Sequence, residues 1–163
     1  MPTIISNNEI CESPFHKVED DENIDLQGEY QLLPLRVYLA NAGALSNRQD
    51  TGVWLAAGEE VEALEGVLDR LPVVALDFPA FTDGRAYSSA NILKRKLGYQ
   101  GEIRAIGDVR RDQLEQMAQC GFNAFEMAPG QDVENSLPGL SGYTHNYQST
   151  VARPEPLFRQ RLA

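Results

Sequence analysis

Short apolar runs alternate with amphipathic segments between Gly52 and Ala128, and this alternation limits the fold more than any other feature. The apolar runs are bounded by Gly or Pro and include a β-branched stretch, which is typical of buried strands. The segments between them carry apolar residues at helical spacing. We expect strands over 52–58, 73–78, 102–108 and 123–128, and helices over 59–71, 86–97 and 110–120.

Strands and helices that alternate through short connections predict right-handed βαβ units and a parallel sheet, which is an α/β fold. A complete (β/α)₈ barrel needs about 250 residues, and this chain has 163. We therefore expect a half-(β/α)₈-barrel-like sheet or a small open sheet. Residues 1–163 are expected to form a single domain with its βα core over 34–128.

Two extensions flank this core. Residues 1–33 are expected to form one or two short strands around Asn7-Asn8, followed by an acidic loop. The core then opens with a helix from Pro34, because Pro favours the first turn of a helix. Residues 129–163 form a C-terminal extension, in which 143–151 could add one edge strand before a loose tail.

The charge distribution excludes some classes of partner. The net charge of −10 argues against nucleic acid, because phosphate binding needs a basic face. No apolar run reaches the roughly 20 residues that span a bilayer, and the N-terminus lacks the pattern of a secretory signal. We therefore expect a cytoplasmic protein with no membrane partner. Residues 85–111 carry seven basic and two acidic side chains, which indicates either a solvated helix face or a docking patch.

Metal and cofactor signatures are missing from the sequence. Cys11 and Cys120 lie far apart, and neither His16 nor His145 has companion ligands at close spacing, so we expect no metal site. The chain contains neither a GxGxxG fingerprint nor a GxSxG nucleophile elbow. We therefore expect no redox cofactor of its own and no serine nucleophile.

The loop after the second core strand is the strongest candidate for an anion site. Ligands of α/β folds gather at the carboxyl ends of parallel strands, and this loop precedes a helix whose N-terminal donors favour anions. We expect an Asp-Gly turn there, with a positive φ at the glycine. The guanidinium of the arginine that follows could bind an anion through two donors, and a serine is expected to cap the helix. The candidate residues are Thr82, Asp83, Gly84, Arg85, Tyr87 and Ser88. The alternative is that the loop caps the helix while Arg85 pairs with Asp77, Asp83 or Asp108.

Carboxylates also stand at the carboxyl ends of the neighbouring strands. Asp77, Asp108 and Glu126 are the candidates for a catalytic acid or base, and Asp108 could instead cap the following helix. Arg104 lies within a strand, and if buried it needs a partner, for which Asp77 is the expected one. A structural network of ion pairs is the alternative to an acid–base pair with a raised pKa.

Two segments, "FPAFTDGRAYS" and "GEIRAIGDVRRDQ", resemble a bacterial family of unknown function whose members are usually encoded beside assimilatory sulfite reductase. The resemblance covers about residues 34–128. Its pattern usually reads FTDGRGYS, and Ala86 replaces the second glycine here. The resemblance implies a cytoplasmic accessory factor of sulfate assimilation, with sulfite reductase or sulfite as its partner.

Two functions from different classes therefore stand as expectations. The first is a non-redox accessory protein that docks to sulfite reductase or assists it, so that any electron carrier belongs to another protein. The second is an anion-binding protein or enzyme that binds a small oxyanion through Arg85 and the helix start at Ser88, with Arg104 as a further candidate for anion binding. Asp77, Asp108 or Glu126 would then serve as its acid or base. A homo-oligomer that covers these strand ends is a third expectation.

Overall fold

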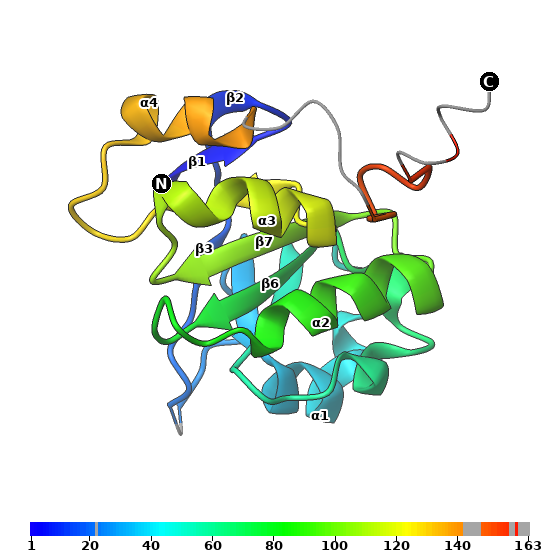
Figure 1. Cartoon of the computed structure of the whole chain (residues 1–163). Coiled ribbons are helices and arrows are strands. Elements are labelled where there is room, and N and C mark those ends of the chain that lie inside the picture. Colours follow the sequence, from blue (N-terminus) through cyan, green and yellow to red (C-terminus); the bar gives the residue numbers. More distant parts are fainter. Residues whose placement is uncertain (22, 142–147, 157–158, 160–163) are drawn as a thin grey trace.

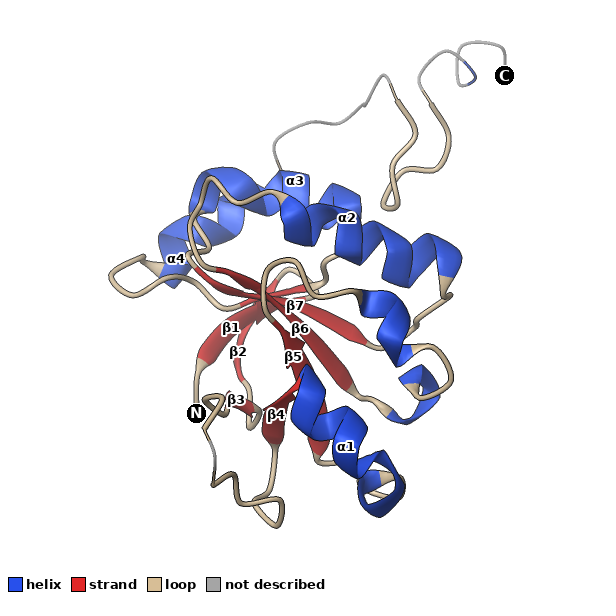
Figure 2. Cartoon of the chain, turned by 90° about the horizontal axis from the view of Figure 1, so that it is seen from below, coloured by secondary structure: helices blue, strands red, loops and turns tan. Residues whose placement is uncertain are grey.

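The computed structural model describes residues 1–21, 23–141, 148–156 and 159 (Figure 1). Eight strands of this described part form one sheet in the order β2-β1-β8-β7-β6-β5-β4-β3. They are β1 (Thr3–Ser6), β2 (Glu9–Glu12), β3 (His16–Lys17), β4 (Gln31–Pro34), β5 (Thr51–Leu55), β6 (Val73–Phe78), β7 (Glu102–Gly107) and β8 (Ala124–Phe125). Strands β3 to β8 run parallel, whereas the β1–β2 hairpin is antiparallel and joins β8. The sheet curls into a half-barrel, so the α/β prediction is confirmed (Figure 2).

Helices cover the outer face of the half-barrel (Figure 2). They are α1 (Leu35–Leu45), α2 (Arg85–Asn91) and α3 (Leu114–Cys120), with the short α4 (Val133–Ser136) after β8. The main core lies between these helices and the sheet, and it buries Tyr38 of α1, Ala90 of α2 and Met117 of α3. Burial of these apolar faces is the main stabilising contribution of the helices.

The inner face of the sheet carries a second, smaller core. Its buried side chains are Leu32, Trp54, Val73, Ala75 and Ile106. Residues 13–18, which we call the N-terminal strap, cross this face. Trp54 Nε1 donates to the carbonyl of Val18 at 2.9 Å, and Arg104 Nη1 donates to the carbonyl of Phe15 at 3.2 Å. The strap therefore closes the side of the half-barrel that the helices leave open.

The helix predicted over 59–71 is wrong. Two 3₁₀ turns stand there instead, Val61–Leu64 and Leu68–Arg70. Gly66 separates them with φ of 90°, a conformation that a continuous helix does not contain. The predicted apolar stripe is nevertheless buried, since Val61, Leu64 and Leu68 all belong to the main core.

The other predicted elements are present, β6 with its predicted bounds and most others with different ends, whereas β3 and β4 stand where an acidic loop was expected. The helix from Pro34 and the hairpin around Asn7-Asn8 are confirmed. Helix α2 continues as a π-helical turn, Ile92–Lys96, and a 3₁₀ turn, Arg111–Gln113, precedes α3. Strand β8 is shorter than predicted and consists of Ala124 and Phe125.

Most of the edge strand expected over 143–151 lies outside the described residues, and 148–151 are not in a strand. In the part of the chain that the structure describes, no helix has the length and apolar character needed to cross a bilayer.

Candidate functional site

The loops that follow β6 and β7 leave the sheet on the same side and lie against each other (Figure 1). The N–H of Phe81 donates to Asp108 Oδ2 at 3.0 Å, and Gln113 Nε2 donates to the carbonyl of Phe81 at 2.8 Å. The N–H of Asp108 donates to the carbonyl of Phe78 at 2.7 Å. These bonds join the two segments that carry the family resemblance into one structure, which we call the Phe81 edge (residues 79–85 and 107–113).

Gly107 makes this close approach of the two loops feasible. Its φ is 91°, which side chains other than glycine rarely adopt. A Cβ at this position would also collide with the carbonyl oxygen of Phe78 and lie 2.9 Å from Asp77 Oδ1. The glycine at the end of β7 is therefore required by the geometry of the Phe81 edge.

Phe81 points outward at the tip of this edge. It is 51% exposed, and the guanidinium carbon of Arg110 lies 4.6 Å from the centre of its ring. Arg110 also donates to both oxygens of Asp108, at 3.0 and 3.1 Å. These bonds from Arg110, with the Phe81 N–H, lower the pKa of Asp108, because they stabilise the carboxylate form. Asp108 thus holds the two loops of the edge together. The predicted cap of the next helix is wrong, because Arg110 is the N-cap residue of the 3₁₀ turn and Gln113 is that of α3.

Arg85 pairs with Asp83 within the same loop. Its Nε donates to Asp83 Oδ1 at 3.0 Å and its Nη2 to Oδ2 at 2.6 Å. The hydrogen bonds from Arg85 lower the pKa of Asp83 to about 2. This geometry is the alternative that the sequence left open, in which Arg85 pairs with a neighbouring carboxylate.

The start of α2 differs from its prediction. The helix begins at Arg85, with Gly84 as the N-cap residue at φ −94°. Gly84 therefore does not use the positive φ expected of it, and Ser88 lies inside the helix, so the predicted serine cap is wrong. Tyr87 packs edge-on against Phe78 with ring centres 5.4 Å apart, and burial raises the pKa of its hydroxyl. Thr82 is exposed to solvent beside Phe81.

Arg104 and Asp77 both lie on the inner face, but the predicted pair between them is wrong. Arg104 is 1% exposed and donates to Glu102 Oε1 at 2.7 Å and to Ser13 Oγ at 2.6 Å. Asp77 lies 3.5 Å from Lys17 Nζ. The strap supplies Ser13 and Lys17, and no local pattern in the sequence places an N-terminal segment on this face.

Lys17 also lies 4.1 Å from the ring centre of Trp54. This cation–π contact and the Asp77 pair hold the lysine between two strands. Glu126 is half-buried past the end of β8, where its N–H donates to the carbonyl of Ala105 at 2.9 Å.

The predicted residues therefore occupy three separate places. Asp77 and Arg104 lie on the inner face under the strap, Glu126 lies past the end of β8, and Asp108 and Arg85 lie in the Phe81 edge, where Arg85 also lines an outer groove. This groove has a volume of 490 Å³. Its lining includes Arg85, Ser88, Ser89, Glu59, Glu60 and Glu62.

A family described as bacterial proteins of unknown function, DUF934, matches residues 52–158. The chain belongs to the DUF934 family. Comparison with curated proteins finds no match.

The matched DUF934 region begins at β5 and contains the whole Phe81 edge. The strap precedes that region, so Ser13 and Lys17 lie outside it. Among the described residues of this DUF934 protein, no group of three or more His, Cys, Asp or Glu side chains is arranged to hold a metal ion.

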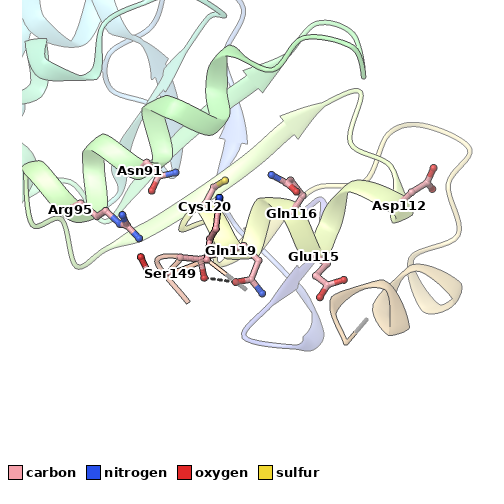
Figure 3. A pocket seen from close by; sticks show the side chains of 10 residues that line it. Asn91, Arg95, Asp112, Glu115, Gln116, Gln119, Cys120 and Ser149 are labelled. Carbon is pink, nitrogen blue, oxygen red and sulfur yellow. Dashed lines mark hydrogen bonds between the residues drawn. The ribbon is translucent and has the colours of Figure 1, made fainter. Parts of the chain in front are cut away.

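A second groove, of 750 Å³, lies between α2 and α3 (Figure 3). Asn91 and Arg95 line it from the α2 side, and Gln116, Gln119 and Cys120 line it from α3. The N–H of Val151 donates to the carbonyl of Gln119 at 3.0 Å, which holds part of the C-terminal extension at the rim. Burial raises the pKa of the Cys120 thiol, so the thiolate is disfavoured there. Sequence reasoning missed this groove because polar residues on a helix surface give no signal of their own.

Proposed function

We propose that this DUF934 protein is a non-redox accessory protein of assimilatory sulfite reduction that docks to sulfite reductase or assists it. One observation carries the choice of a docking role over catalysis: the candidate charged residues pair locally and do not meet in one cleft. The partner is inferred from the resemblance of the two segments that meet in the Phe81 edge.

The protonation chemistry of the edge supports a docking role. A general acid needs a carboxyl whose pKa is raised toward the working pH, within a cleft. Arg85 and Arg110 instead lower the pKa of Asp83 and Asp108. Both carboxylates therefore stay charged at neutral pH and act as fixed parts of a surface.

A binding measurement with purified sulfite reductase of the same organism tests this proposal. We expect the chain to bind the immobilised reductase saturably, while an unrelated acidic protein of similar size does not bind. A strain that lacks the chain should grow more slowly on sulfate as its sole sulfur source, and normally on cysteine. Absence of binding together with normal growth on sulfate would refute the accessory role.

Binding of a small oxyanion is the second candidate, and the outer groove is the observation that favours it. Arg85, Ser88 and Ser89 offer donors there, although Glu59 and Glu60, which also line the groove, oppose the binding of an anion. If the groove binds sulfite, sulfate or phosphate, the anion raises the melting temperature of the protein in a concentration-dependent way. Arg85→Ala should abolish that shift and Arg36→Ala should keep it; an unchanged shift in Arg85→Ala excludes this groove.

A further inference from the structure

We propose that the Phe81 edge is the docking surface, and that its partner offers an apolar pocket with a carboxylate at the rim. This inference rests on the proposed accessory function and adds where the contact lies and what chemistry receives it.

The backbone of Phe81 is fixed although its ring is exposed. Its N–H and its carbonyl are bonded to Asp108 and Gln113 respectively, and both partners belong to the segment after β7. A backbone that is already held before binding loses little conformational freedom when a partner covers the segment. Aromatic side chains and arginine are enriched in the buried centre of protein interfaces, and the Phe81 edge presents one of each in direct contact.

Charge is arranged asymmetrically around this ring. The side chain of Arg110 is 45% exposed whereas its partner Asp108 is 27% exposed, and Arg85 is 62% exposed over an Asp83 that is 15% exposed. In both pairs the guanidinium faces solvent and the carboxylate lies beneath it. The surface beside Phe81 is therefore suited to an incoming carboxylate, which arginine binds as a fork.

The chain contains close controls for both features. Leu39 of α1 is 37% exposed, so it is another large apolar side chain at the surface. Arg36 of α1 pairs with Asp20, and there both partners are open to solvent, at 60% and 42%. Arg36→Glu thus changes the net charge as much as Arg110→Glu does, at a residue outside the Phe81 edge.

The test is the affinity of purified sulfite reductase for the full chain and its variants, after circular dichroism has shown that each variant is folded. We expect Phe81→Ala and Arg110→Glu each to weaken binding by about tenfold or more, as loss of a central interface residue does. Arg110→Lys, which keeps the charge, should bind with an intermediate affinity. Leu39→Ala and Arg36→Glu should bind as the wild type does, and added salt should weaken the wild-type complex.

The possible failures are distinguishable. If the wild type does not bind, the proposed function falls and this inference falls with it. If the wild type binds while Phe81→Ala and Arg110→Glu match their controls, the docking surface is elsewhere and only this inference is overturned. If Phe81→Ala weakens binding and neither Arg110→Glu nor salt does, the carboxylate at the rim is refuted.

Discussion

Arg104 is the most deeply buried charge in the described structure, and two of its three hydrogen bonds tie the strap to β7. Arg104→Met would leave Ser13 and the Phe15 carbonyl without their donor and Glu102 without its counter-ion. We expect the free energy of unfolding in urea to fall by about 3 kcal/mol. This value is at the lower end of the range for a broken buried ion pair, because the Glu102 side chain is partly exposed to water. Arg36→Met breaks an exposed pair and should cause no measurable loss; equal losses in the two variants would contradict the structural role of Arg104.

The Asp83–Arg85 pair predicts a specific dependence on pH. Arg85 lowers the pKa of Asp83 from an ordinary 3.8 to about 2 in the folded state. The pair therefore stabilises the fold above pH 3.8, and this contribution is lost as the pH falls through 2. Titration of the Asp83 side-chain carbon by NMR should give a pKa near 2 in the wild type and a higher pKa in Arg85→Ala, where the backbone N–H of residue 85 alone still donates to Asp83. The same titration should be unchanged in Arg36→Ala, and a wild-type value of 3.8 would show that the pair does not form in solution.

At the scale of elements, Gly66 decides the structure between β5 and β6. Its φ is 90° and the position of a Cβ there is free of contacts within 4 Å, so Gly66→Ala tests the backbone alone. We expect the substitution to lower the free energy of unfolding in urea by about 1 kcal/mol, the cost of a left-handed alanine. If residues 59–71 formed a continuous helix, Gly66→Ala would instead raise the free energy of unfolding by up to about 1 kcal/mol.

Gly43→Ala is a matched control for the direction of this change in stability. Gly43 lies within α1, and nothing lies within 4 Å of its Cβ position. Gly43→Ala should stabilise the protein by about 0.5–1 kcal/mol, because alanine loses less backbone entropy in a helix. If both Gly66→Ala and Gly43→Ala stabilise the protein, residues 61–70 form a continuous α-helix.

The elements that depend on local pattern were predictable, and those that depend on distant contacts were not. The β-branched run at 73–78 gave β6 at its observed bounds, and periodicity correctly placed Leu64 in the core even though Gly66 breaks the helix. The contact of Arg104 with Ser13 was missed because Ser13 lies 91 positions away along the chain. The Phe81 edge was foreseen only as two separate loops, since the bonds that join them follow from how β6 and β7 pair.

The first 18 residues form bonds to strands spread across the whole width of the sheet. Strand β1 pairs with β8 near one end of the sheet, and β3 pairs with β4 at the other. Between them the strap bonds to Arg104 of β7 and to Trp54 of β5. An N-terminal segment with anchors this widely spread should not leave the sheet while the rest remains folded, so the strap, the sheet and its helices should unfold as one cooperative unit.

Trp54 is the single tryptophan of the chain, and this makes the cooperativity measurable. The strap contacts its ring through Lys17 and its Nε1 through Val18, so its fluorescence follows release of the strap, whereas far-UV circular dichroism follows the helices and the sheet. We expect the two signals to change at the same urea concentration in the wild type, and to shift together to a lower concentration in Arg104→Met. A fluorescence change that precedes the loss of circular dichroism would mean that the strap unfolds separately, and that the inner face, with Asp77 beneath Lys17, opens within an otherwise folded protein.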